Sequence, residues 1–115
     1  MIRKLSILAF VLVVVSSCST SKGLYSWYNY NDVAYGYMKN PTEAAEQNLL
    51  STYNKTIANQ KGTRGIVPPG IYAEKGYLLL KANKVEEGIS CLKKEIELYP
   101  EAEKFLGRII KQYEE

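Results

Sequence analysis

Apolar residues recur every three to four positions through most of the chain, and this period predicts α-helices. Asn29 or Asn31 can cap a first helix that ends near Lys39. The run Asn40-Pro41-Thr42-Glu43 places a capping residue at Asn40 and a proline at the first helical position, so a second helix begins there and ends near Gln60. Its apolar stripe consists of Ala45, Leu49, Leu50, Tyr53 and Ile57.

Three further helices are predicted after a glycine-containing loop at residues 61–67. Pro68-Pro69-Gly70 opens the first of them, and Asn83 suits the left-handed backbone that ends it. The inward faces of the three helices consist of Ile71, Leu78, Leu79 and Ala82, then Val85, Ile89, Leu92 and Ile96, and, after Pro100, Ala102, Phe105, Leu106, Ile109, Ile110 and Tyr113. No stretch after the first 17 residues alternates apolar and polar positions as a strand does, so the pattern predicts an all-α domain of about five helices.

The first 18 residues, MIRKLSILAFVLVVVSSC, have the pattern of a secretory signal peptide. A basic head precedes an apolar run from Leu5 to Val15, which is shorter than the roughly 20 residues that a membrane-spanning helix needs. Val15-Ser16-Ser17-Cys18 resembles the lipobox of bacterial lipoproteins, in which a diacylglycerol is attached to the cysteine and the preceding peptide is removed. The resemblance implies cleavage between Ser17 and Cys18 and lipid attachment, with palmitate-type acyl chains, at Cys18.

These features predict three segments: a signal peptide at 1–17, a lipidated cysteine and short tether at 18–24, and a helical domain at 25–115. The residues after Cys18 are Ser-Thr-Ser-Lys-Gly, without an adjacent aspartate, which for a lipoprotein implies an outer-membrane location facing the periplasm. Because six residues span roughly 20 Å at most, the domain is expected close to the bilayer.

Removing the signal peptide takes away Arg3 and Lys4, two of the 15 basic residues, and none of the 12 acidic ones. The net charge then falls from +3 to about +1, which argues against a nucleic-acid partner. With Cys18 acylated, Cys91 has no second thiol for an internal disulfide. We predict that Cys91 is a small buried apolar residue that reacts slowly with thiol reagents.

The chain offers little catalytic chemistry. It contains no histidine, no GxSxG sequence, no glycine-rich phosphate loop and no cluster of metal-ligating residues. Adjacent acidic pairs such as Glu86-Glu87 point about 100° apart on a helix and cannot flank one bond. We therefore predict that the protein is not an enzyme, that it uses no cofactor or metal, and that it has no small-molecule substrate.

Five of the ten tyrosines and the single tryptophan fall in YSWYNYNDVAYGY at residues 25–37. Helical spacing predicts one core-facing set of side chains: Tyr30, Ala34, Tyr37 and Met38. Trp27 is predicted to pack over the first helix. Tyr28 and Tyr35 lie toward the other side, and we predict that these two contact a protein partner, since exposed aromatic residues are enriched at interfaces.

The segment from Pro69 to Pro100 resembles a tetratricopeptide repeat, a helical hairpin of about 34 residues. The resemblance rests on five positions, namely Tyr72, Gly76, Leu79, Leu92 and Pro100. Lys75, Gly88 and Glu95 depart from the pattern, and these departures argue against close packing of the hairpin and against a peptide-binding groove.

Three stretches, YSWYNYNDVAYGYMKNP, VPPGIYAEKGYLLL and EGISCLKKEIELYPEAEKFLGRIIK, resemble a family of small bacterial lipoproteins with a domain of unknown function. Members are often encoded beside lipoproteins similar to the curli secretion channel. The resemblance implies a protein-binding or assembly accessory module in an envelope or secretion complex, with an envelope protein as partner and the membrane bound through the N-terminal lipid. A structural subunit of a membrane-associated assembly is the alternative, and an envelope enzyme is a remote one.

Overall fold

The computed structural model describes residues 3–4 and 23–114 of the 115-residue chain. Ser17, Cys18 and most of the predicted signal peptide lie outside the described residues. Residues 23–114 form five α-helices and no strand, which confirms the prediction of an all-α domain. The helices are α2 (Tyr30–Lys39), α3 (Glu43–Ala58), α4 (Ile71–Lys81), α5 (Val85–Leu98) and α6 (Glu103–Glu114), with a single 3₁₀ turn at Pro100–Ala102 before α6.

The start of α3 corrects one prediction. Thr42, not Asn40, caps this helix: its backbone is extended, and its Oγ1 accepts a hydrogen bond from the Ala45 N–H at 3.1 Å. Asn40 instead ends α2, where its N–H donates to the Gly36 carbonyl. The residue before a proline is sterically driven away from helical backbone, so Asn40 and Pro41 form the link between the two helices.

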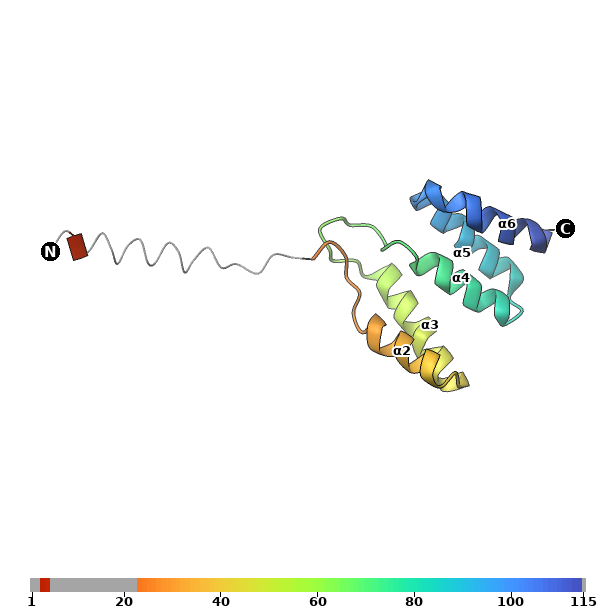
Figure 1. Cartoon of the computed structure of the whole chain (residues 1–115), viewed down its shortest axis with the longest axis horizontal. Helices are drawn as coiled ribbons and strands as arrows, with labels where there is room; N and C mark the ends of the chain where they lie inside the picture. Colours follow the sequence, from red (N-terminus) through yellow and green to blue (C-terminus); the bar gives the residue numbers. More distant parts are fainter. Residues whose placement is uncertain (1–2, 5–22, 115) are drawn as a thin grey trace.

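The helices pack in chain order (Figure 1). Helices α2 and α3 form one hairpin, α4 and α5 form a second, and α6 packs against α5. The turn between α4 and α5 contains Asn83, whose positive φ of 65° confirms the predicted left-handed stop. Residues 59–70 form the connection between the two hairpins, in agreement with the predicted loop.

Helices α4 and α5 approach each other closely at two glycines. A Cβ built on Gly76 would lie 2.8 Å from the Gly88 carbonyl oxygen, and one on Gly88 would lie 2.9 Å from the Gly76 carbonyl oxygen. Leu92 and Leu80 fill the space beside these glycines. The departure of Gly88 from the repeat pattern therefore does not prevent close packing of the hairpin, because a glycine lets the two backbones approach each other.

Two clusters of buried residues form the core. Leu49, Tyr53, Val67, Ile71 and Leu78 make the first, beneath α2, α3 and α4. Leu80, Leu92, Leu106 and Ile110 make the second, between α4, α5 and α6. Cys91 is buried on α5 as predicted, and burial raises the pKa of its thiol.

Some residues assigned to inward faces are exposed. Met38 is 80% exposed and Phe105 is 69% exposed, while Ala82 and Tyr113 also face solvent. The apolar stripes of α2 and α6 are wider than the surfaces these helices bury against their neighbours. The exposed side chains of Met38 and Phe105 line an open groove.

Candidate functional site

An apolar groove of about 540 Å³ lies between α2, α4 and α6. Six side chains from the two cores form part of its lining, namely Leu49, Tyr53, Leu78, Leu80, Leu92 and Leu106. Its other lining residues are Tyr30, Ala34, Tyr37 and Met38 from α2, Ala73, Glu74, Tyr77 and Lys81 from α4, and Phe105 and Ile109 from α6. The sequence argued against a peptide-binding groove, and whether this groove binds a peptide is not tested; it is open because α2 and α6 stand on either side of α4 without covering it.

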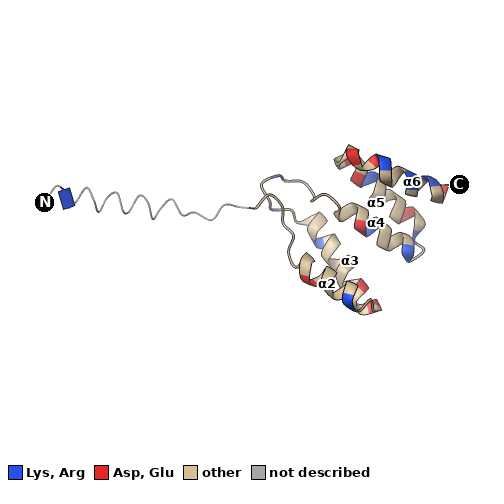
Figure 2. Cartoon of the chain, in the orientation of Figure 1, with Lys and Arg blue, Asp and Glu red and all other residues tan. Residues whose placement is uncertain are grey.

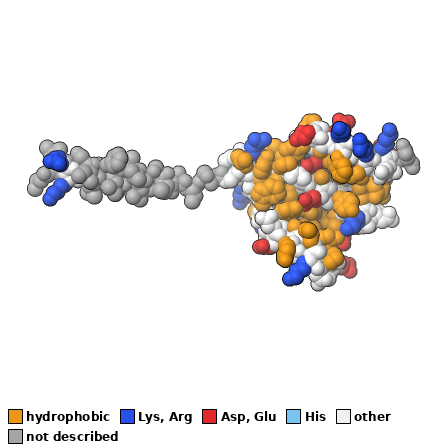
Figure 3. Space-filling view, viewed as in Figure 1, with side chains coloured by type: hydrophobic (Ala, Val, Ile, Leu, Met, Phe, Trp, Pro, Cys, Tyr) orange, Lys and Arg blue, Asp and Glu red, His pale blue; other side chains and the backbone are white. Residues whose placement is uncertain are grey.

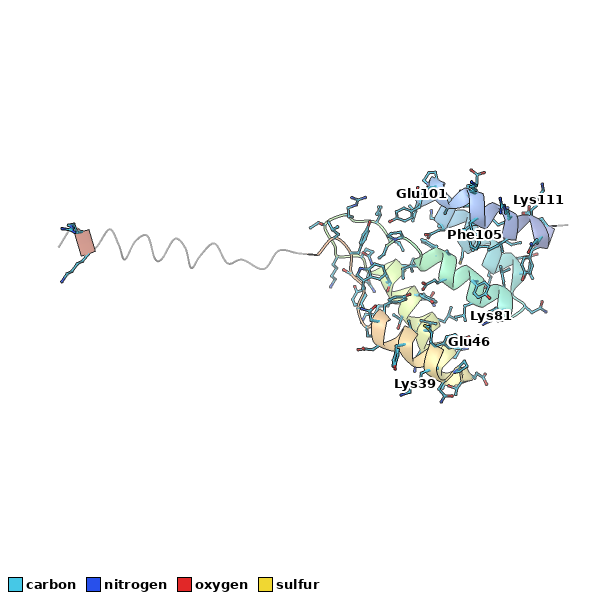
Figure 4. All side chains as sticks on the ribbon, in the orientation of Figure 1. Lys39, Glu46, Lys81, Glu101, Phe105 and Lys111 are labelled. Atoms are coloured by element: carbon cyan, nitrogen blue, oxygen red, sulfur yellow. The ribbon has the colours of Figure 1, made fainter. Side chains whose placement is uncertain are left out.

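Large apolar side chains stand exposed around this groove. Met38 on α2, Tyr77 on α4 and Phe105 on α6 are all exposed, and each lines the groove. Hydrophobic side chains cover much of the face shown in Figure 3. Figure 4 places Phe105 on α6 and Lys81 at the C-terminal end of α4. Three exposed large apolar side chains around one concavity are typical of a binding surface, whereas single ones scattered over a surface are ordinary.

Glu74 links α2, α3 and α4 by hydrogen bonds, at the end of the groove near the N-terminus of α4. Its carboxylate accepts hydrogen bonds from the Tyr30 hydroxyl at 2.7 and 2.8 Å and from the Tyr53 hydroxyl at 3.0 Å. Burial, together with the hydrogen bond to Glu74 and its charge, raises the pKa of Tyr30 to about 12. The same causes, led by burial, raise the pKa of Tyr53. Both hydroxyls thus remain protonated donors at neutral pH.

Lys81 marks the other end of the groove. Its Nζ lies 5.9 Å from the ring centroid of Tyr37 and 5.5 Å from that of Tyr77. Glu74 and Lys81 are seven residues apart on α4, so they share one face about 10 Å apart. The apolar groove therefore has a carboxylate at one end and an ammonium group at the other.

The two tyrosines predicted to contact a partner do not lie in this groove. Tyr35 is on α2 and 66% exposed, so it is free to contact another molecule. Tyr28 precedes α2 with a positive φ of 52°, and its hydroxyl donates to the Asn59 carbonyl while Lys55 Nζ lies 4.6 Å from its ring centroid. Its role in the fold therefore includes holding the segment before α2 against the end of α3.

Sequence reasoning missed Tyr77 as a groove residue and assigned Met38 and Phe105 to the core. A local signal for α4 was available: Glu74, Tyr77 and Lys81 follow one another at spacings of three and four and share one face of the helix with Leu78. Nothing local indicates that α2 and α6 stand beside that face, because their positions depend on contacts between distant segments.

Two kinds of feature are absent from the described residues, a metal-holding cluster and a membrane-spanning helix. Among residues 3–4 and 23–114, no three His, Cys, Asp or Glu side chains lie close enough to hold a metal ion. In that same part of the chain, no helix has the length and apolar character needed to cross a membrane. The groove offers apolar contact along its length and one charge of each sign.

Comparison with known proteins identifies one family. A family model described as "Domain of unknown function (DUF4810)" matches residues 24–109, which include the groove. No curated protein and no solved structure matches the chain.

Proposed function

The chain belongs to the DUF4810 family, and from that premise we propose that it is an outer-membrane lipoprotein whose helical domain binds another envelope protein as an assembly accessory. The groove over α4 carries this proposal. The groove combines an open concave shape, an apolar lining and large exposed apolar side chains that a partner can contact. The lipobox-like sequence ending at Cys18 supports the membrane attachment.

An amphipathic helix is the occupant that fits the groove best. The groove follows α4 and is bordered by α2 and α6, so an added helix could pack its apolar face on Tyr77, Met38 and Phe105. Helix-in-groove binding uses apolar anchors at spacings of three, four and seven residues, which match a concavity about two turns long. The partner segment is therefore a helix with one apolar face.

The charges at the two ends add a requirement on the partner. Glu74 favours a lysine or arginine on the bound helix, and Lys81 favours an aspartate or glutamate about two turns away. Because opposite charges select orientation as well as partner, they determine which way the helix lies in the groove. A helix with the reversed order of charges would meet like charges at both ends.

Site-specific photo-cross-linking in intact cells tests the proposal. A photoreactive phenylalanine analogue is placed at Phe105, inside the groove, or at Lys111, which is exposed on the same helix but outside the groove lining. We expect one discrete cross-linked envelope protein from position 105 and none from position 111. The cross-linked peptide is then identified, and it should be an amphipathic helix.

A charge-reversal experiment makes the test specific. Lys81→Glu should reduce the cross-link at position 105 about tenfold, because a favourable charge pair becomes a repulsive one. Reversing the acidic residue that the bound helix presents to Lys81 should restore the cross-link. Equal labelling from positions 105 and 111, or a cross-link insensitive to charge at position 81, would rule out the groove as the binding site.

A further inference from the structure

The N-terminal segment of the described domain is attached to the loop after α3. The Thr63 N–H donates to the Gly23 carbonyl at 3.0 Å, and the Arg64 N–H donates to the Leu24 carbonyl at 3.1 Å. Gly62 permits this contact, since a Cβ there would lie 2.2 Å from the Leu24 carbonyl oxygen. The chain therefore leaves the domain at one defined point, Gly23.

Ser26 strengthens the same attachment. Its N–H donates to Gln60 Oε1 at 3.0 Å, and its carbonyl accepts from Gln60 Nε2 at 2.7 Å. Its Oγ accepts from the Lys61 N–H at 3.0 Å. Only residues 19–22 then separate Cys18 from the attached segment, and four residues span at most about 14 Å. A lipid on Cys18 would hold this end of the domain at the headgroup layer.

The surface around Gly23 carries apolar and aromatic side chains. Leu24 is 59% exposed and Trp27 is 38% exposed, and Tyr28 is exposed beside them. The ring of Trp27 packs against the ring of Tyr25 in an edge-to-face arrangement, with 6.2 Å between the ring centroids. This contact holds the exposed Trp27 ring in place. Tryptophan and tyrosine are enriched at membrane interfaces because each joins an apolar ring to a polar group.

The same end of the domain is positively charged. Residues 23–31 and 51–70 contain three basic residues, Lys55, Lys61 and Arg64, and no acidic one. All three are exposed. In Figure 2 the ribbon is blue at basic residues along this loop and on α3, and the red acidic positions lie mainly on the other helices. Basic residues within a Debye length of an anionic leaflet, about 8 Å at physiological salt, are attracted to it.

From these observations we infer that the end of the domain formed by Leu24, Trp27, Tyr28, Lys55, Lys61 and Arg64, here called the basal surface, lies on the headgroups of the leaflet that holds the acyl chains. Its ligand is anionic phospholipid. The inference rests on the proposed lipid anchor and assigns Tyr28 to the membrane instead of a protein partner. Since α4 begins after residues 59–70, the Glu74 end of the groove lies nearer the membrane and the Lys81 end farther from it.

Trp27 provides the measurement, because it is the single tryptophan of the chain. The full-length protein is purified from a host that processes lipoproteins, and mass spectrometry establishes whether Cys18 is acylated. It is then reconstituted into vesicles of phosphatidylethanolamine and phosphatidylglycerol at 3:1 in which some lipids carry a nitroxide on the headgroup. We expect quenching of Trp27 fluorescence and a shift of its emission to shorter wavelength.

Two variants separate surface affinity from proximity enforced by the tether. A ten-residue Gly/Ser insertion between Ser21 and Lys22 should leave the quenching largely intact if the basal surface itself binds lipid. In that lengthened protein, Lys61→Glu with Arg64→Glu should lower the ratio of docked to free domain about tenfold or more. Lys104→Glu with Arg108→Glu, which reverses two exposed cations on α6, is the matched control and should change little.

The outcomes distinguish this inference from its premise. An unacylated Cys18 would overturn the proposed anchor and the membrane docking with it. An acylated protein in which Trp27 is unquenched, or loses its quenching equally in both charge-reversed variants, would overturn the basal surface alone and leave the groove proposal standing. Quenching that persists in vesicles of uncharged phosphatidylcholine, undiminished by Lys61→Glu with Arg64→Glu, would contradict anionic phospholipid as the ligand.

Discussion

At the scale of single residues, Glu95 places a carboxylate in the buried part of the described domain. Glu95 is 3% exposed on α5, and its Oε1 accepts from the Gly70 N–H at 2.5 Å, just before α4 begins. Its Oε2 is buried without a hydrogen-bond partner. Burial raises the pKa of Glu95, although the Gly70, Ala73 and Tyr72 backbone N–H groups oppose the shift.

The raised pKa of Glu95 predicts a pH-dependent contribution to stability. The folded state binds the proton more tightly than the unfolded state, whose glutamate pKa is about 4.3. Glu95 therefore contributes most to the free energy of unfolding at acidic pH, below the pKa of the unfolded state. This contribution falls as the pH rises from about 4.3 through the raised pKa of the folded state. Glu95→Gln should remove this slope while keeping an acceptor for Gly70. Urea unfolding of the parent and of Glu95→Gln between pH 4 and 8 measures this slope. If the free energy of unfolding changes with pH in the same way in both proteins, the raised pKa of Glu95 is contradicted.

Single residues also show where sequence reasoning succeeds. The burial of Cys91 was predictable because its position next to Leu92 on an amphipathic helix is a local property. The hydrogen bond of Tyr28 was not predictable, since its partner Asn59 lies 31 residues away and belongs to another element. Lipidation of Cys18 stays a prediction, as that residue lies outside the described part of the chain.

At the scale of helices, the contact between Gly76 and Gly88 predicts an unusual response to alanine. Alanine normally favours a helix over glycine by about 1 kcal/mol. At Gly88 the added Cβ would meet the Gly76 carbonyl oxygen at 2.9 Å and Leu80 at 2.8 Å, and backbone cannot move aside cheaply. We expect Gly88→Ala to lower the free energy of unfolding by about 1–2 kcal/mol net.

Gly36 on α2 is the matched control for that substitution. A Cβ at Gly36 meets nothing within 4 Å, so Gly36→Ala should raise the free energy of unfolding by about 0.5–1 kcal/mol. Circular dichroism during chemical denaturation measures both variants. Stabilisation by alanine at both positions would mean that α4 and α5 are not in such close contact in solution.

Helix boundaries were largely predictable, whereas the groove was not. Apolar period, Asn83 and the prolines are local signals, so the five helices lie close to their predicted ranges. The cap of α3 was misplaced by two residues because Asn40 and Thr42 are both good capping residues. The groove depends on how α2, α4 and α6 sit beside one another, and an apolar stripe does not reveal which part of it remains uncovered.

At the scale of the whole molecule, residues 23–26 are attached to residues 60–64, so the first residues of the described domain have a defined place on its surface. The hydrogen bonds here join the start of the described domain to the loop between its two hairpins. Loop segments are usually the first to open locally, but this one is held by side-chain and backbone bonds together. A single change in the loop should release the segment and leave the helices folded.

Gly62→Ala is that change. The added Cβ would lie 2.2 Å from the Leu24 carbonyl oxygen and 2.5 Å from Tyr25 Cα, so residues 23–26 must move away from the loop. Because the core residues lie elsewhere, we expect helical circular dichroism to be retained while proteolysis before Trp27 speeds up at least tenfold. Thr63→Ala is the control, since the bond from residue 63 to Gly23 uses the backbone N–H and should survive. If both variants resist protease as the parent does, the close contact of Gly62 with Leu24 and Tyr25 is not what holds residues 23–26 against the loop.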